Sequence, residues 1–339
     1  MREDELKPIF ETHLQHPVVY LAFAVRAEST GDLAGVAPFA SDSCLICGES
    51  DGHLSIWTID GNQVREAERF VTSAGSLYQL AVHPQGTLVA TAGQGEVTLW
   101  QLPHATQLDT FRFEPGERFQ AIAFAPHGDM LLVASDREVI RAIDLASGSV
   151  VQTFPGGERN PSIACHPAGN EFVHLACFQG GSVISASQLA GDTDLPENKP
   201  TENRITTTCD ALYPGSFSPD GTLYACSDRH VRVYRYPSFE RVHAFDLYGN
   251  LDPEPRDSLY LEARWSNTVF SPDGRSLLAG SPLGTLFSWN LRTGSIQHQW
   301  PAHRGGVLAM ASDPTGRLFA SSGQDRSLKL WALPSTELQ

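Results

Sequence analysis

His83-Pro84-Gln85-Gly86 is the first of six turns that share Pro at the second position and Gly at the fourth. The other five are Ala125-Pro126-His127-Gly128, His166-Pro167-Ala168-Gly169, Ser218-Pro219-Asp220-Gly221, Ser271-Pro272-Asp273-Gly274 and Asp313-Pro314-Thr315-Gly316. Successive prolines of these turns are 42, 41, 52, 53 and 42 residues apart. A nearly fixed spacing of this size indicates an array of one repeated supersecondary unit.

Short apolar runs flank each turn. Around the first turn, the sequence predicts an inner strand at 77–82, a second strand at 87–92, a third at 96–100 and a fourth at 107–113. Runs of this length, rich in β-branched residues and bounded by Gly or Pro, are typical of strands. Four strands in every ~40–45 residues are typical of one blade of a β-propeller.

The third strand of each repeat allows the repeats to be counted. It ends on an aromatic residue in five repeats and on an aliphatic one in two, and the seven final residues are Trp57, Trp100, Ile143, Ala186, Tyr234, Trp289 and Trp331. The prediction is an all-β, seven-bladed β-propeller of four-stranded antiparallel blades. The closed ring makes residues 1–339 a single domain, with short tails at 1–7 and 335–339.

The two ends of the chain are expected to share one blade. Too few residues follow Trp331 to form a complete fourth strand, whereas a segment that resembles the outer-strand segment 296–300 precedes the first inner strand, at 9–16. We therefore expect the N-terminal strand to complete blade 7 and close the ring, which removes exposed sheet edges.

Charge and cysteine content limit the classes of function. The net charge of −15 argues against a non-specific nucleic-acid binder. Cys44 and Cys47 stand three apart on a predicted strand, where they would point to opposite faces, so we expect buried thiols and no metal site. The segment 1–7 has no apolar core of a signal peptide, and no run is long enough to span a membrane, which predicts a cytoplasmic protein.

The best-formed repeat resembles those of the WD40 family. It contains Ala302-His303, the turn Asp313-Pro314-Thr315-Gly316, and the run from Ser321 to Trp331. The resemblance implies a hydrogen-bonded structural tetrad of His303, Ser321, Asp325 and Trp331. Blade 1 keeps Asp51 and Trp57, has Cys47 at the Ser position, and offers His16 only approximately.

A ring of Arg and aromatic residues is predicted where the inner strands begin, on the top face of the propeller. Its members are Tyr78, Arg118, Phe119, Arg159, Tyr213, Arg264, Trp265 and Arg304. These residue types dominate protein interfaces, and guanidinium groups favour carboxylate or phosphate. The alternative is that each Arg is neutralised by a neighbour such as Glu117, Glu158 or Glu262.

Three extra-long connections, at 26–41, 190–203 and 248–262, are further candidates for function. The main hypothesis is a non-catalytic scaffold that binds a protein or peptide segment, acidic or phosphorylated, on the top face. We expect a chain that is monomeric by itself and part of a complex, with no cofactor, metal, nucleic acid or membrane partner. The alternatives are a metal-assisted hydrolase or lactonase of the propeller type and a nucleic-acid-binding subunit.

Overall fold

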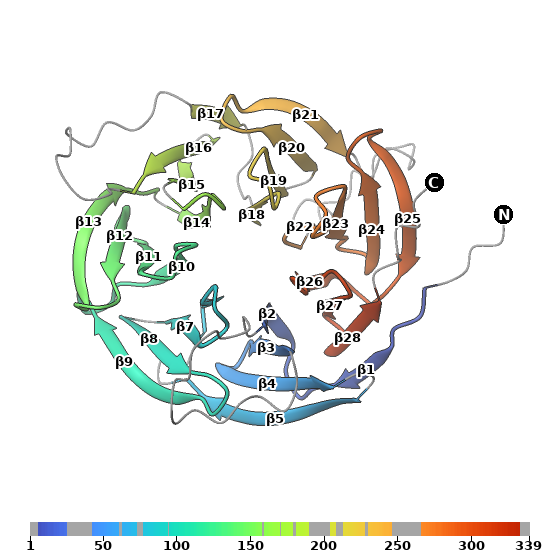
Figure 1. The fold of residues 1–339 in the computed structure, drawn as a ribbon, viewed down its shortest axis with the longest axis horizontal. Coiled ribbons are helices and arrows are strands. Elements are labelled where there is room, and N and C mark those ends of the chain that lie inside the picture. The colour runs from blue at the N-terminus through green and yellow to red at the C-terminus, as the bar shows by residue number, and fades with distance from the viewer. Residues whose placement is uncertain are drawn as a thin grey trace.

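Seven four-stranded sheets stand around a common axis in this computed structural model (Figure 1). The structure describes residues 6–25, 43–60, 63–72, 77–93, 95–157, 159–169, 171–178, 181–189, 204–207, 213–227, 230–245 and 266–332. The connections at 26–41, 190–203 and 248–262 lie outside the described residues. Within these ranges the chain forms twenty-eight strands and no helix, so no helix capable of crossing a membrane is found there.

The blades follow one another in chain order, each listed from the axis outward. Blade 1 contains β2 (Val18–Val25), β3 (Ser43–Glu49), β4 (His53–Asp60) and β5 (Gln63–Val71). Blade 2 contains β6 (Gln79–Val82), β7 (Leu88–Ala92), β8 (Glu96–Gln101) and β9 (Thr106–Arg112). Blade 3 contains β10 (Phe119–Phe124), β11 (Met130–Ser135), β12 (Val139–Asp144) and β13 (Ser149–Pro155). Blade 4 contains β14 (Arg159–Cys165), β15 (Glu171–Phe178), β16 (Gly181–Gln188) and β17 (Arg204–Thr207).

The remaining three blades complete the circle. Blade 5 contains β18 (Tyr213–Phe217), β19 (Leu223–Ser227), β20 (Val231–Arg235) and β21 (Glu240–Phe245). Blade 6 contains β22 (Val269–Phe270), β23 (Ser276–Gly280), β24 (Thr285–Asn290) and β25 (Ser295–Pro301). Blade 7 contains β26 (Val307–Ser312), β27 (Leu318–Gly323), β28 (Ser327–Ala332) and β1 (Phe10–His13). The predicted seven-bladed architecture is confirmed.

The N-terminal strand closes the ring, as the sequence predicts. β1 is antiparallel to β28, with Phe10 opposite Leu330 and His13 opposite Ser327. Phe10 also packs on Trp57 of blade 1, with ring centroids 5.9 Å apart. The first described strand therefore joins the last sheet of the ring to the first by both backbone pairing and side-chain packing (Figure 1).

The core of the protein lies between neighbouring blades. On β3, Leu45 and Cys47 belong to the apolar cluster shared with blade 7, whereas Cys44 and Ile46 belong to the cluster shared with blade 2. Because alternate side chains of a strand point to opposite faces, each middle strand is buried on both sides. The two thiols are thus separated and free, and burial raises the pKa of Cys44 to about 12.

Each Pro-x-Gly turn connects the first strand of a blade to the second, and some of these turns also contact a neighbouring blade. In all six turns the Gly has a φ between 67° and 97°, a conformation that favours glycine. His83 Nδ1 accepts from the Gln85 N–H, so its Nε2–H donates to the carbonyl of Gly128 in the next blade, at 2.9 Å. A Cβ at Gly128 would lie 2.3 Å from that Nε2 atom, so the histidine contact also requires glycine.

A β-bulge recurs between the third and fourth strands of blades 1, 2, 3, 5 and 6. In each case one residue of the outer strand is skipped in the register, next to the position of Trp or its substitute. The skipped residues are Ala67, Leu108, Val151, Val242 and Gln297. Because bulges strengthen local twist, they bend the exposed outer edges away from a flat geometry that would favour aggregation.

Candidate partner-binding face

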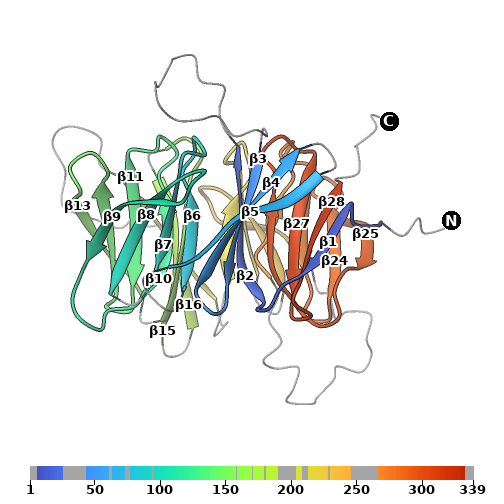
Figure 2. The ribbon, with the colours of Figure 1, turned by 90° about the horizontal axis from the view of Figure 1, so that it is seen from below.

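The top face is the side of the ring on which the innermost strands begin, and the strands run between it and the bottom face (Figure 2). Arg118 directly precedes β10 and Arg304 lies just before β26. The Arg118 N–H donates to Asp136 Oδ1 at 3.0 Å, and the Arg304 N–H donates to Asp325 Oδ2 at 2.8 Å. In both blades the aspartate lies in the turn between the second and third strands, so both arginines are fixed on the same rim of the ring. They are not direct counterparts, because the residue that corresponds to Arg118 in blade 7 is Gly306, whose N–H donates to Gln324 Oε1 at 3.1 Å.

Both arginine side chains are exposed. No ion pair to either guanidinium occurs within the described part of the chain. The neighbouring Glu117, which we considered as a partner of Arg118, is completely buried and accepts from Arg141 Nη1 at 2.6 Å. Arg141 in turn lies over the ring of Phe113, at 5.0 Å. The sequence alternative that Glu117 neutralises Arg118 is therefore wrong.

The aromatic members of the predicted ring differ from one another. Phe119 was expected on the surface, but its side chain has 0% exposure and packs edge-on against Phe113 at 4.9 Å. The register of β10 shifts between Phe119 and Ala121, so one residue is skipped and Phe119 points into the core. Tyr78 is half-buried, and its carbonyl accepts from the hydroxyl of Tyr20.

The other predicted members cannot be placed. Arg159 and Tyr213 begin β14 and β18, but their side chains lie outside the described part. Arg264 and Trp265 lie outside the described residues altogether. Arg118 and Arg304 are therefore the two arginines of the predicted ring whose side chains the structure describes.

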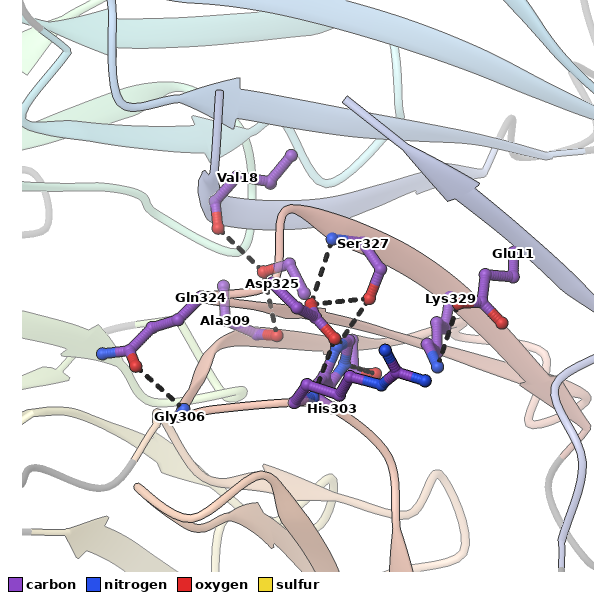
Figure 3. A network of polar contacts seen from close by, with 12 residues as sticks. Glu11, Val18, His303, Gly306, Ala309, Gln324, Asp325, Ser327 and Lys329 are labelled. Atoms are coloured by element: carbon purple, nitrogen blue, oxygen red, sulfur yellow. Dashed lines mark hydrogen bonds and ion pairs between the residues drawn. The ribbon is translucent and has the colours of Figure 1, made fainter. Parts of the chain in front are cut away.

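The residues of the expected tetrad form one continuous network, and Figure 3 shows its His303 and Asp325 beside Ser327. Trp331 Nε1 donates to Ser321 Oγ at 2.9 Å, and Ser321 Oγ lies 2.8 Å from His303 Nε2. His303 Nδ1 lies 3.2 Å from Asp325 Oδ1. Because a carboxylate only accepts, Nδ1 carries the imidazole proton and Nε2 accepts from the serine hydroxyl.

Ser327 is a member of this network that the sequence analysis missed. Its hydroxyl lies 2.9 Å from His303 Nδ1 and donates to Asp325 Oδ1 at 2.7 Å. Its N–H also donates to Asp325 Oδ1, at 3.1 Å. A Ser two residues after a turn Asp is the signal that could have indicated it.

The pKa values in the network follow from these contacts. Burial lowers the pKa of His303, although the nearby Asp325 opposes the effect. Burial alone would raise the pKa of Asp325, but hydrogen bonds from the Arg304 N–H and from Ser327 hold it at about 2. The aspartate is therefore anionic and the imidazole neutral near pH 7.

The order Ser, His, Asp also resembles a hydrolytic triad. However, Ser321 has no exposed surface, and its oxygen already accepts from Trp331. A nucleophile must reach its substrate, so this geometry supports a structural network in place of a catalytic one.

Blade 1 has a related but broken arrangement. His16 Nε2 lies 3.3 Å from Asp51 Oδ2, and His53 Nδ1 lies 2.8 Å from the same oxygen. Trp57 Nε1 donates to Ser55 at 3.1 Å, so Ser55 provides the acceptor where we had aligned Cys47. The imidazole–carboxylate pair and the indole–hydroxyl pair are thus both kept, as separate units.

A hollow of about 560 Å³ opens beside the network of blade 7. Its lining includes Glu11 and His13 of β1, Arg304, Asp325 and Lys329. Lys329 Nζ is paired with Glu11 at 3.2 Å, and Asp325 is occupied by its own hydrogen bonds. Arg304 is therefore the cation of this hollow that has no ion-pair partner among the described residues.

Comparison with known proteins assigns the repeats. The family model described as WD domain, G-beta repeat matches residues 201–235 and 294–332. The matched segments are WD40 repeats within a seven-bladed propeller. Rat WD repeat-containing protein 81 is 32% identical over 134 residues, which cover 39% of this chain and 6% of that protein.

Two relatives align with most of this propeller. Mouse Striatin-4 is 22% identical over 339 residues, covering 91% of this chain and 42% of its own. The U3 small nucleolar RNA-associated protein 15 homolog of chicken is 23% identical over 263 residues, covering 75% of this chain and 45% of its own. The chain thus spans less than half the length of each of these three relatives.

Proposed function

We propose that this WD40 propeller is a non-catalytic subunit of a complex, in which the top face binds an acidic or phosphorylated segment of a protein partner. Its relatives support a general role as a protein-interaction scaffold. The observation that carries the finer proposal is the pair Arg118 and Arg304, both exposed on the same rim and held there by backbone bonds to Asp136 and Asp325. A fixed backbone lowers the entropy cost of binding.

The chemistry of guanidinium favours this kind of partner. An exposed arginine without an internal ion pair can form paired hydrogen bonds with a carboxylate or phosphate. On a chain with net charge −15, such local cations contribute to specificity and association rate more than to affinity. We also propose a cytoplasmic location, since the described cysteines are free thiols, as a reducing compartment favours.

Capture of native partners by matched variants tests the proposal. The baits are the wild type, Arg118→Glu with Arg304→Glu, and the control Arg65→Glu with Arg112→Glu on the outer strands of blades 1 and 2. Both variants change the net charge equally. We expect some partners to bind the wild type and the control but not the top-face variant. Phosphatase treatment or an acidic competitor peptide should release at least some of these partners from the wild type. Identical capture by all three folded baits would refute a top-face site.

A further inference from the structure

In the described parts of blades 5, 6 and 7, five exposed arginines lie on the bottom face, opposite to the proposed site. The bottom face carries the connections between first and second strands and between third and fourth strands. The five residues, which we call the bottom arginine patch, are Arg235, Arg241, Arg275, Arg292 and Arg317. They belong to blades 5, 6 and 7, which are consecutive in the ring (Figure 1).

Specific contacts bring the turns that carry the patch together. The Leu291 N–H donates to the carbonyl of Arg275 at 2.9 Å, which joins the two bottom turns of blade 6. His243 Nε2 lies 2.8 Å from the carbonyl of Leu291, which attaches β21 of blade 5 to the same turn. A Cβ at Gly316 would lie 3.4 Å from the ring of Pro272, so the turn before Arg317 also touches blade 6.

The backbone at the centre of the patch is held in place. The Arg275 N–H donates to Asp273 Oδ1 at 3.0 Å. The Arg292 N–H donates to Asn290 Oδ1 at 2.9 Å, and the Thr293 N–H donates to the same oxygen at 3.1 Å. Both arginines therefore extend from capped turns, and only their side chains lose freedom on binding.

The charge of the patch is only partly compensated by neighbouring acids. Among the described residues of blades 5 to 7, the exposed carboxylates on the same surface are Asp220, Glu240 and Asp273, and Asp313 is buried. Asp220 and Asp273 each accept from a serine hydroxyl of their own turn. Among the described residues, no ion pair joins any of the five arginines to a carboxylate. The patch is thus locally cationic on a chain of net charge −15.

Blade 3 shows that the fold does not require these cations. Its turn from Asp144 to Gly148 has the same pattern as the turn from Asn290 to Gly294, since the final Gly N–H of each donates to the first residue at 2.8 Å. Ala146 stands where blade 6 has Arg292, and Asp129 stands where it has Arg275. The turn geometry is kept while the charge changes sign.

We propose that the bottom arginine patch docks an acidic, extended segment of a protein partner. Carboxylates match the paired donors of guanidinium, and Ile296, which is 49% exposed on the strand that leaves the Arg292 turn, adds an apolar contact. The strong negative charge of the rest of the chain would repel a long polyphosphate backbone more than a short acidic peptide. This second site is independent of the proposed top-face function.

Binding of a defined probe to charge-matched variants tests the second site. The probe is a short fluorescein-labelled oligoglutamate peptide, followed by anisotropy at low salt, with a labelled oligothymidylate of equal length as the nucleic-acid arm. The proteins are the wild type, Arg275→Glu with Arg292→Glu, Arg118→Glu with Arg304→Glu, and Arg65→Glu with Arg112→Glu. Circular dichroism and thermal unfolding verify that each variant is folded.

We expect the variant Arg275→Glu with Arg292→Glu to bind oligoglutamate at least tenfold more weakly than the wild type, a loss of about 1.4 kcal/mol. The variant Arg65→Glu with Arg112→Glu should change the affinity little. If only the variant Arg118→Glu with Arg304→Glu binds the peptide more weakly, the second site is refuted and the top-face proposal gains support. Equal effects of all three pairs, or no binding by the wild type, would also refute it. If the wild type binds oligothymidylate more tightly than oligoglutamate, and the variant Arg275→Glu with Arg292→Glu does not bind it, the occupant of the patch is a nucleic acid and the acidic-peptide proposal is refuted.

Discussion

Asp325 is a single residue that fixes three neighbouring groups. Its carboxylate accepts from the Arg304 N–H, lies within hydrogen-bond distance of His303, and accepts from both donors of Ser327. Its side chain is only 14% exposed, so water cannot fully replace these partners when the carboxylate is removed. We therefore expect the contribution of this network to the free energy of unfolding to depend mainly on Asp325.

We expect Asp325→Ala to lower the free energy of unfolding by about 1–3 kcal/mol, because it leaves buried donors unpaired. The matched control is Asp136→Ala, which also removes a carboxylate that accepts from an arginine backbone N–H but breaks no contact with a buried imidazole. Urea unfolding of both variants measures the difference. Equal losses in the two variants would show that the His303 contact adds nothing.

The pH dependence of stability is a second prediction for this network. Burial places the folded-state pKa of His303 below its ordinary value of 6.5, so the unfolded chain takes up the proton more readily. The neutral imidazole therefore contributes fully above pH 6.5, and its contribution is lost as the pH falls below that value. Asp325, with a pKa of about 2 against an ordinary 3.8, loses its contribution only at lower pH.

We expect the urea midpoint of the wild type to fall between about pH 7 and about pH 5, and to fall less steeply in His303→Gln. The comparison of slopes removes the effect of the other histidines, which both proteins share. A slope that is the same in both proteins would mean that His303 titrates alike in the folded and unfolded states.

At the scale of an element, β1 has more influence than its four residues suggest. It pairs with β28, and Phe10 packs against blade 1. Deletion of residues 1–16 should therefore lower the melting temperature far more than deletion of residues 1–5. Differential scanning calorimetry measures the change, and addition of a synthetic peptide of residues 6–16 should restore part of it. Unchanged melting after the long deletion would contradict the role of β1 in closure.

β10 illustrates why part of the candidate site could not be predicted. A sequence pattern places Arg118 and Phe119 side by side at the start of a strand, and both residue types suit an interface. Neighbouring blades cover both faces of this inner strand, so Phe119 lies in the apolar cluster shared by blades 2 and 3, and residue type alone does not distinguish that position from an exposed rim. Glu117 likewise pairs with Arg141, a choice set by the position of the third strand.

At the scale of the whole molecule, the architecture could be predicted because its signals repeat. The Pro-x-Gly turns and the terminal Trp residues are local requirements, and each recurs often enough to survive losses in single blades. The bottom arginine patch depends instead on residues brought together from three blades. One clue was present in the sequence, since Arg275 and Arg317 each directly follow the Gly of a turn in successive repeats.

The shared blade 7 also affects the order in which the molecule is made. β1 leaves the ribosome before the other described strands of the ring, yet its partner β28 is synthesised after all of them. Six blades can therefore form their sheets during translation, whereas the seventh must wait until the final repeat has emerged. A chain that ends before β28 therefore leaves β1 without a partner strand, and the ring stays open.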